Sequence, residues 1–353
     1  MDGAAISLSG TDADTDLGLD RLPLVEARVL AGPGDFEAML RSERPVVIRG
    51  LFDAWPALEA GRAGPARLNA YLKRLDQGAM APVMEAPASS GGRYAYGPDM
   101  REFSFSKRQK GVSETLDRIE SLLGQPDAPF VAIQMLPLST HLLGFVDQNA
   151  LAAMPPQIVP RLWVGGPLKT QTHNDRDHNL ACVIAGRRRF VLYPPEQVAN
   201  LYVGPLDNPP PLSLVDPEAP DLERFPRYRQ AHAAAHVAWL EPGEALFVPK
   251  YWWHHVTSLD PYNAMVNYWW GDWATGLERA QDAFLTALLA LKALPTGEKA
   301  YWRAMFEAYV FGEGDAAVAH IPEGLRGALG AMSPSLRASL KQQLKMAYLR
   351  GTP

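Results

Sequence analysis

The sequence predicts a mainly β fold, a β-barrel or jelly roll with helical additions. Short runs rich in β-branched and aromatic residues, separated by turn residues, fill the chain from residue 130 to about residue 270. Apolar residues at helical spacing precede and follow this part. The chain has 353 residues, enough for one large domain with additions or for two domains. Strands in the middle and helices at both ends therefore predict a barrel or jelly roll to which the helices are added.

Composition and charge exclude several classes of protein. Hydrophobic residues make up 47% of the chain and charged residues 21%, which is typical of a soluble globular protein. The net charge of -5 argues against a general electrostatic grip on nucleic acid, so no nucleic-acid partner is expected. The single cysteine, Cys182, excludes an intramolecular disulfide framework and a cysteine-rich zinc site.

The first twenty residues are polar and acidic, and we expect them to form a disordered tail. They lack the basic start and the apolar stretch of a secretory signal. No apolar run in the chain is long enough to span a bilayer. The sequence therefore predicts a cytoplasmic protein with no membrane partner.

Helices and a strand are expected between the tail and the central strands. Apolar spacing predicts a helix over 35–41, followed by a strand over 45–49. A turn and a helical pattern follow over 51–71. Residues 83–106 are aromatic and rich in turn residues, which predicts loops and short strands. A further helix is predicted over 112–123.

The central strands are predicted at 130–135, 161–166, 179–184 and 187–193. A hairpin or a tight strand turn at Ala185-Gly186 joins the last two. The proline-rich stretch 204–220 can be neither a helix nor a central strand, so we expect a surface excursion there. Three short strands are then predicted within 236–273.

The region 276–353 is expected to be helical. Apolar residues from Phe284 to Leu291 recur at i, i+4 and i+7, the spacing of an apolar stripe. Two further helices are predicted over 301–311 and 336–349.

Three potential metal ligands occur in two distant segments. His173 and Asp175 are two residues apart, and His254 follows about eighty residues later. Alternate residues of an extended strand point to the same face, so His173 and Asp175 can reach one point inside a barrel. Two imidazoles and one carboxylate are the ligand set of non-haem iron(II) oxygenases. The sequence therefore predicts a catalytic iron(II) site with these three ligands.

The same segments contain alternative ligands. Asp177 shares the parity of Asp175, and His178 is a second imidazole in the first segment. Only one of His254 and His255 can point inward, because adjacent strand residues face opposite ways. The competing interpretation is a polar loop together with an aromatic core strand that carries a surface histidine.

Longer motifs resemble the JmjC/cupin-like hydroxylase superfamily. They are RPVVIRGLFDAWPAL at 44–58, T-x-x-H-x-D-x-x-x-N at 170–179, AGRRRFVLYPP at 185–195, PGEALFVPKYWWHHVTSL at 242–259 and NYWW at 267–270. The chain resembles in particular the branch that contains the asparaginyl hydroxylase of hypoxia-inducible factor and bacterial cupin-like relatives. The resemblance implies a double-stranded β-helix, iron(II), and 2-oxoglutarate as cosubstrate.

The resemblance also implies roles for cosubstrate-binding residues. Thr170 matches a hydroxyl that binds a carboxylate of 2-oxoglutarate, and Asn179 matches a polar residue near the metal. Asn267 and Trp269 match late-strand residues that line the site. Arg188 stands where the family usually has a lysine for the distal carboxylate. A guanidinium can bind that carboxylate through a bidentate fork, although its reach and shape differ from those of lysine.

Other cations lie close to these positions in the sequence. Lys169, next to Thr170, is an alternative partner for the carboxylate. Arg187 and Arg189 are expected to be solvated charges on the strand that carries Arg188.

The resemblance implies a domain order and a function. We expect a tail over 1–20, a JmjC/cupin-like double-stranded β-helix with N-terminal helical elements over 21–275, and a helical region over 276–353 that forms a homodimer interface. The expected activity is hydroxylation of a C–H bond, most readily of a protein side chain. The alternatives are a hydroxylase of a small molecule and a non-catalytic cupin-type module that binds a metal or ligand.

Overall fold

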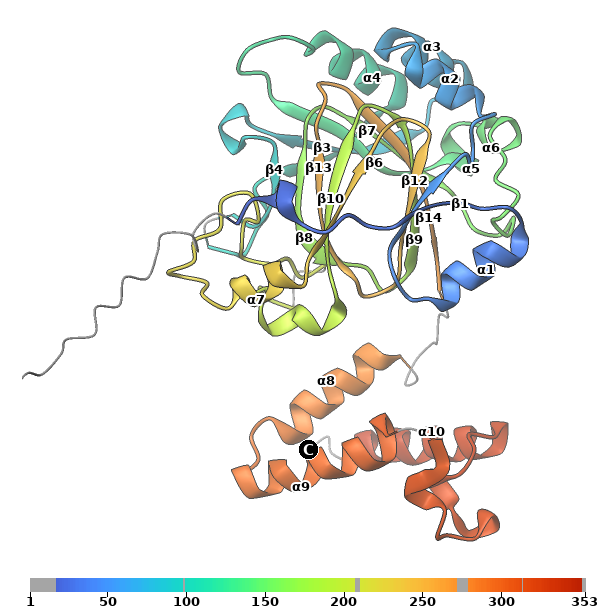
Figure 1. Cartoon of the computed structure of the whole chain (residues 1–353), viewed down its shortest axis with the longest axis vertical. Helices are drawn as coiled ribbons and strands as arrows, with labels where there is room; N and C mark the ends of the chain where they lie inside the picture. The colour runs from blue at the N-terminus through green and yellow to red at the C-terminus, as the bar shows by residue number, and fades with distance from the viewer. Residues whose placement is uncertain (1–16, 98, 207–209, 272–278, 313, 351–353) are drawn as a thin grey trace, which may run out of the picture. The chain divides into compact units, whose positions relative to one another are not determined.

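The computed structural model describes residues 17–97, 99–206, 210–271, 279–312 and 314–350 (Figure 1). The chain divides into two compact units, residues 1–271 and 272–353. The boundary predicted between residues 275 and 276, and residues 1–16 of the predicted tail, lie outside the described residues. Leu19, near the end of that tail, is buried together with Leu22, so packing of the first unit begins before residue 21.

Two β-sheets form the first unit. The larger sheet has the strand order β1-β2-β12-β9-β14-β7-β6-β3-β5, and the smaller has the order β11-β10-β13-β8-β4. The strands of the larger sheet are β1 (Ala27–Val29), β2 (Val46–Arg49), β3 (Met80–Ala86), β5 (Ser106–Gly111), β6 (Phe130–Pro137), β7 (Arg161–Gly165), β9 (His178–Ala185), β12 (Glu244–Val248) and β14 (Asn263–Trp270). Those of the smaller sheet are β4 (Arg93–Tyr94), β8 (Lys169–Asn174), β10 (Arg188–Tyr193), β11 (His236–Leu240) and β13 (Trp253–Ser258).

Four strands of each sheet build a jelly roll. The neighbours in β12-β9-β14-β7 and in β11-β10-β13-β8 are all antiparallel. The remaining strands extend the larger sheet on both sides and add β4 to the smaller sheet. The predicted mainly β fold, a jelly roll with helical additions, is confirmed.

The strand β9 shows why the central segments are so apolar. Leu180, Cys182 and Ile184 pack into the cluster on the outer side of the larger sheet, whereas Ala181 and Val183 pack between the two sheets. Both faces of the strand are covered, so the sequence reads as a continuous apolar run instead of an alternating one.

The helices of the first unit begin where proline permits a helix to begin. Pro33, Pro56 and Pro65 are the first residues of α1, α2 and α3, where the missing N–H costs nothing. The helices of this unit are α1 (Pro33–Arg41), α2 (Pro56–Arg62), α3 (Pro65–Leu75), α4 (Val112–Ser121), α5 (Leu138–His141), α6 (Phe145–Gln148) and α7 (Tyr228–Ala233).

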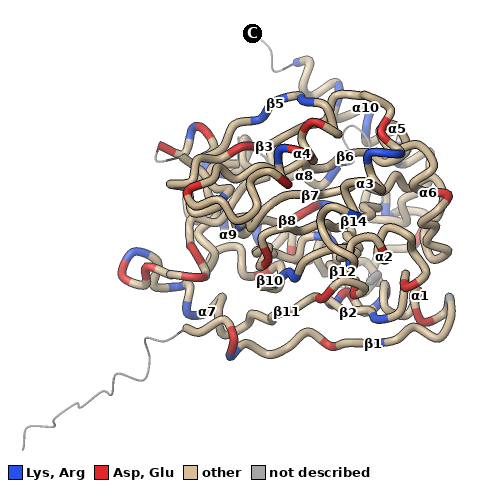
Figure 2. The backbone as a smooth tube through the Cα atoms, turned by 90° about the horizontal axis from the view of Figure 1, so that it is seen from above, with Lys and Arg blue, Asp and Glu red and all other residues tan. Residues whose placement is uncertain are grey.

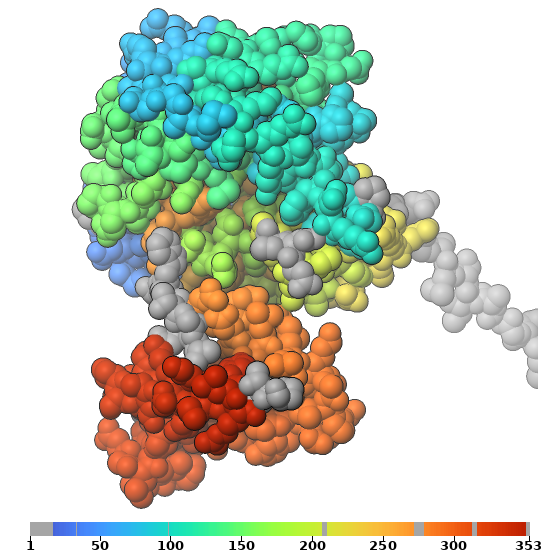
Figure 3. Space-filling model, turned by 180° about the vertical axis from the view of Figure 1, so that it is seen from behind, coloured from blue at the N-terminus to red at the C-terminus, as the bar shows by residue number. Residues whose placement is uncertain are grey.

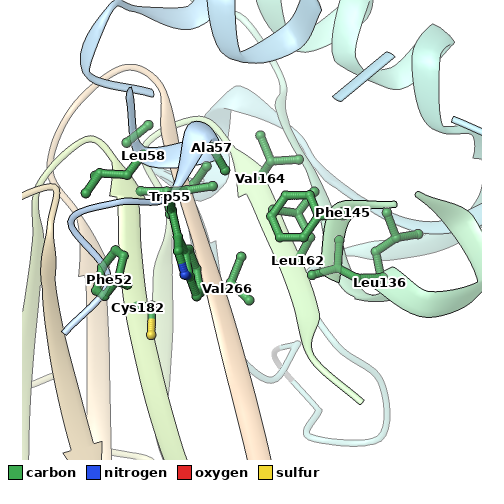
Figure 4. Close-up of a cluster of buried hydrophobic side chains, with 14 of the residues drawn as sticks. Phe52, Trp55, Ala57, Leu58, Leu136, Phe145, Leu162, Val164, Cys182 and Val266 are labelled. Atoms are coloured by element: carbon green, nitrogen blue, oxygen red, sulfur yellow. The ribbon is translucent and has the colours of Figure 1, made fainter. Parts of the chain in front are cut away.

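The main hydrophobic core lies between these helices and the larger sheet. It joins Trp55 and Leu58 to strand residues such as Leu162, Cys182 and Val266 (Figure 4). Segments coloured blue to green, which include α3 and α4, form the surface of the first unit on this side (Figure 3). A separate, smaller cluster fills the space between the two sheets.

The edge of the larger sheet is protected by charge. Its last strand, β5, carries Lys107, Arg108 and Lys110 (Figure 2). Basic side chains on an edge strand oppose pairing with a strand of another molecule.

Two local predictions need correction. The strands on either side of Ala185-Gly186 belong to different sheets, which excludes the hairpin. The other alternative, a tight strand turn, agrees with the two residues that separate β9 from β10. Gly186 has φ 68°, and a Cβ at this position would lie 2.4 Å from the carbonyl oxygen of Tyr262. The segment 236–273 was predicted to hold three strands and holds four, β11 to β14.

The second unit is helical, as its spacing predicted. Its helices are α8 (Ala280–Leu291), α9 (Thr296–Phe306) and α10 (Pro334–Arg350), and Pro295 separates the first two. After α9 come a π-helical segment, Glu307–Phe311, and three 3₁₀ segments, Gly314–Val318, Glu323–Leu325 and Gly327–Leu329. The first unit contains 3₁₀ segments at Leu19–Arg21, Ala88–Ser90 and Pro195–Ala199. Of the residues described in this unit, Val318 alone is buried. Within the described ranges, no helix combines the length and the apolar character needed to cross a membrane.

Gly61 provides a test of how α2 packs on β9. A Cβ at Gly61 would lie 1.9 Å from the carbonyl oxygen of Ile184. Gly→Ala in a helix normally stabilises by about 1 kcal/mol, but this Cβ would push two backbones apart, and overpacking costs about 1–3 kcal/mol. We expect Gly61→Ala to lower the free energy of unfolding measured by urea denaturation. Gly34→Ala in α1, with nothing within 4 Å of the added Cβ, is the control and is expected to leave stability equal or higher. Equal stability of both variants would contradict this packing.

Candidate metal centre

Three side chains from two neighbouring strands converge at one end of the smaller sheet. His173 lies in β8, Asp175 follows one residue after that strand ends, and His254 lies in β13. One ligand atom from each residue lies within 4.8 Å of the other two. His254 Nε2 is 3.7 Å from Asp175 Oδ2, and the two imidazole centroids are 4.4 Å apart. Among the described residues, no second group of three His, Cys, Asp or Glu side chains is arranged to hold a metal ion.

A bulge in β8 brings Thr170 and His173 to the same side of the sheet. His173 pairs with His254 and Thr170 pairs with Val256, so three steps along β8 match two along β13. The extra residue reverses the alternation of faces. Without the bulge, two residues an odd number of positions apart would face opposite ways.

Backbone carbonyls fix the orientation of both imidazoles. His173 Nδ1 donates to the carbonyl oxygen of Gln171 at 2.8 Å, and His254 Nδ1 donates to that of Trp252 at 3.0 Å. A carbonyl can only accept, so the proton belongs on Nδ1 and the lone pair on Nε2 of each ring. This is the arrangement in which a histidine binds a metal through Nε2.

The charge of the triad suits a divalent cation. Burial, together with the nearby His173, lowers the pKa of His254 to about 4, so His254 is neutral at neutral pH. The two imidazoles and the Asp175 carboxyl group offer nitrogen and oxygen ligand atoms. Such a set fits iron(II) and similar first-row metals.

A cavity extends from the triad into the space between the two sheets. All eight predicted site residues line it: His173, Asp175, His254, Thr170, Asn179, Arg188, Asn267 and Trp269. Gln134, Trp163 and Ser258 also line it and were missed from the sequence. Ser258 shares the parity of His254 on β13, so strand alternation alone could have identified it.

Arg188 is a buried cation for which the described residues provide no ion-pair partner. Its Nε is buried and makes no hydrogen bond, and no carboxylate of the described residues forms an ion pair with it. Burial lowers the pKa of its guanidinium to about 10, so it remains charged at neutral pH. An uncompensated buried charge is strongly unfavourable. A carboxylate or another anion in the cavity would compensate this charge.

The neighbouring cations are used elsewhere. Arg187 forms an exposed ion pair with Asp260 at 2.8 Å, as expected for a surface charge. Arg189 is not solvated as predicted, because it forms an ion pair with Glu218 on the outer face of the sheet. Lys169 pairs with the same carboxylate and does not line the cavity, so it is not an alternative partner for an anion there.

Amide and indole groups of the larger sheet form the opposite wall. Trp163 Nε1 donates to Asn267 Oδ1 at 2.7 Å, and Asn267 Nδ2 donates to Asn179 Oδ1 at 3.1 Å. Trp269 packs edge-on against Trp163 at 5.8 Å and lies under the Arg161 guanidinium at 5.3 Å. The Trp269 Nε1 is buried and has no hydrogen-bond partner among the described residues.

The alternative ligands lie outside the cluster. His178 stacks on Phe247 and lies against Trp270, and its Nδ1 accepts from the Lys250 backbone N–H. His255 is buried on the other face of β13 from His254, where burial lowers its pKa to about 3. Asp177 is not part of the group that can hold a metal.

Comparison with known proteins connects this geometry to a family. The sequence profile described as "Cupin-like domain" matches residues 34–275. Human HSPB1-associated protein 1 is 37% identical over 141 residues, which cover 39% of this chain and 28% of that protein. Lysine-specific demethylase 8 of Xenopus tropicalis is 28% identical over 237 residues, which cover 65% of this chain and 48% of that protein. The human bifunctional peptidase and (3S)-lysyl hydroxylase JMJD7 is 27% identical over 258 residues, which cover 64% of this chain and 77% of that protein. The match thus spans under a third of HSPB1-associated protein 1.

Substitution of the triad tests whether it binds a metal. Manganese(II), which resembles iron(II) but resists oxidation, should raise the melting temperature of the wild-type protein. A ligand at one hundred times its dissociation constant stabilises by about 2.7 kcal/mol. We expect Asp175→Ala and His173→Ala to lose this increase. Asp177→Asn, which alters the alternative carboxylate, should keep it. An unchanged increase in Asp175→Ala would contradict the assignment.

Proposed function

The chain belongs to the cupin-like domain family within the JmjC/cupin superfamily, and from this premise we propose that it is an iron(II)- and 2-oxoglutarate-dependent oxygenase that hydroxylates a C–H bond. The observation that carries the proposal is the presence, in one cavity, of the His173–Asp175–His254 triad and the unpaired guanidinium of Arg188. The triad suits a divalent metal and the guanidinium suits a carboxylate. A 2-oxo dicarboxylic acid would use both groups, because it chelates the metal at one end and presents a second carboxylate to the guanidinium at the other.

Bound iron(II), with 2-oxoglutarate and O₂, supplies oxidative decarboxylation and the hydroxylation of a C–H bond. His173, Asp175 and His254 would hold the metal. His173 and His254 lie in strands of the smaller sheet and Asp175 directly follows β8, so the side toward the larger sheet would be left for cosubstrate and substrate. The carbonyl oxygens of Gln171 and Trp252 keep the two imidazoles aimed at the metal position.

Arg188 and Thr170 would bind the distal carboxylate. Both line the cavity, and Ser258, directly opposite Arg188 in the β10–β13 register, adds a second hydroxyl. A bidentate bond to a carboxylate would satisfy the buried guanidinium. Arginine in the position of the family's usual lysine is therefore compatible with the role.

The remaining walls would orient the ligands and exclude water. Phe190, Val256 and Met265 are apolar and close the cavity between the sheets. Asn179 and Asn267 are fixed by their mutual hydrogen bond, so their free polar atoms point in defined directions. Excluding water strengthens every electrostatic contact inside the site.

A non-catalytic module with a structural metal would not require a buried cation, without an ion-pair partner among the described residues, in the same cavity as the triad. We therefore favour the enzyme over that alternative. For the substrate we propose a protein side chain, supported by two relatives whose names refer to lysine and lysyl groups. The test is mass spectrometry of cell lysate proteins after incubation with enzyme, iron(II) and 2-oxoglutarate. A gain of one oxygen on a peptide supports the protein substrate, and a gain confined to small molecules contradicts it.

We also propose that the second unit forms a homodimer. None of the described residues of α8, α9 and α10 is buried, and Leu289 exposes 79% of its surface. Helices without a buried face are not stable alone. We expect sedimentation equilibrium to give twice the chain mass for the wild type and the single chain mass for Leu289→Glu. A monomeric wild type at high micromolar concentration would contradict the dimer.

Arg188 allows binding and folding to be separated. Arg188→Met removes a buried unpaired charge, so we expect the ligand-free variant to melt at or above the wild-type temperature. The same change should remove the stabilisation by N-oxalylglycine with manganese(II), and raise the KM for 2-oxoglutarate by roughly 10- to 100-fold. Arg187→Gln, which changes the exposed neighbour, is the control and should leave the KM unchanged. Normal N-oxalylglycine stabilisation of Arg188→Met would contradict the proposed role.

A further inference from the structure

One acidic side chain joins three strands on the outer face of the smaller sheet. The Glu218 carboxylate forms ion pairs with Lys169 of β8 and Arg189 of β10, and accepts a hydrogen bond from Thr257 Oγ1 of β13 at 2.9 Å. The Glu218 side chain is only 18% exposed. Burial alone would raise the pKa of Glu218, but the hydrogen bonds from Lys169 and Thr257 and the charges of Lys169 and Arg189 outweigh it and lower the pKa.

The three partners of Glu218 form one row across the sheet. Thr257 is the register partner of Lys169 on one side and of Arg189 on the other. Adjacent strand residues face opposite ways. The sequence neighbours of the three partners therefore point to the inner face, where they line the cavity. These neighbours are Thr170 on β8, Arg188 on β10, and Val256 and Ser258 on β13.

The segment that carries Glu218 is attached to the smaller sheet at further points, on β4 and β8. Asp216 forms an ion pair with Arg93 of β4 at 2.8 Å. Gln171 Nε2 donates to the carbonyl oxygens of Ser213 and Val215, at 3.0 and 2.6 Å. Residues 213–218, the later part of the proline-rich stretch, are thus held against the smaller sheet by hydrogen bonds and ion pairs.

We propose that Glu218 is a positioning residue for the cosubstrate. By clamping the outer face of β8, β10 and β13, it sets the spacing of Thr170, Arg188 and Ser258 on the inner face, where the proposed function places the distal carboxylate of 2-oxoglutarate. It touches neither metal nor cosubstrate. This inference rests on the proposed oxygenase activity.

The charges give the clamp a second effect. Lys169 and Arg189 flank Thr257 on either side, and without Glu218 they would be two uncompensated cations beside Arg188. Glu218 neutralises them and holds them on the outer face. Of the Lys and Arg side chains that the structure describes, Arg188 alone lines the cavity. The distal carboxylate of the cosubstrate would therefore bind to the guanidinium of Arg188 and to no other lysine or arginine of the cavity wall.

The test compares Glu218→Gln with Glu244→Gln. Glu244 is a matched control, because it is 17% exposed and also forms an ion pair, with Arg49 at 2.7 Å, but on strands β12 and β2. We expect Glu218→Gln to raise the KM for 2-oxoglutarate on the order of tenfold, the usual lower effect of removing a supporting residue. The kcat should change by less than about twofold, because the metal triad is untouched. Stabilisation by manganese(II) alone should stay at the wild-type level, and Glu218→Asp should recover part of the KM.

Three outcomes would overturn the inference. One is an active wild type whose KM for 2-oxoglutarate is unchanged in Glu218→Gln. Another is an equal rise in KM in Glu244→Gln, which would indicate a general loss of stability. If Glu218→Gln does not fold, the variant Thr257→Val is used instead, because it removes one hydrogen bond to Glu218. An unchanged KM for 2-oxoglutarate in Thr257→Val is the third outcome that would overturn the inference. A wild type that neither turns over 2-oxoglutarate nor is stabilised by N-oxalylglycine with manganese(II) would instead contradict the proposed function itself.

Discussion

A buried positive charge on Arg188, for which the described residues provide no ion-pair partner, is the constraint on which the proposed site depends. A protein has no reason to retain such a charge for stability, because replacing it with an apolar group would relieve the desolvation cost. The surrounding structure supplies the stability that Arg188 does not. The larger sheet is covered by a continuous hydrophobic core, and the smaller sheet is fixed from behind by Glu218 and its partners. The unsatisfied guanidinium then becomes the strongest feature of the cavity, and it stands on the same sheet as the metal triad.

The two faces of the smaller sheet carry different groups, because alternate residues of a strand point to opposite faces. The inner faces of β8, β10 and β13 carry His173, His254 and the groups proposed to bind the carboxylate, and the outer faces carry the ion pairs with Glu218. A site built on paired strands is more rigid than one built on loops. A bulge in β8 interrupts this alternation and allows Thr170 and His173 to face the same cavity.

Much of this arrangement could be predicted from the sequence, for identifiable reasons. The period-two pattern placed His173 and Asp175 on one face, and the match to family motifs pointed to Arg188, Asn179 and Asn267. The fold class followed from the order of strands and helices. Sheet membership could not be predicted, because the crossing at Gly186 depends on which distant strands pair with β9 and β10. The burial of Arg189 was missed for the same reason, since its partner Glu218 is twenty-nine residues away in a stretch without regular structure. Trp163 and Ser258 were within reach of the alternation argument but carried no motif.

The central claim is that the metal triad and Arg188 together form one binding site for a metal-chelating dicarboxylate. Calorimetric titration of N-oxalylglycine into the full chain, with and without saturating manganese(II), tests it most directly, because a shared site requires each ligand to strengthen the binding of the other. The account predicts one analogue bound per chain, with affinity at least about tenfold higher when the metal is present. Binding of the analogue with equal affinity in both conditions, or no binding at all, would contradict it.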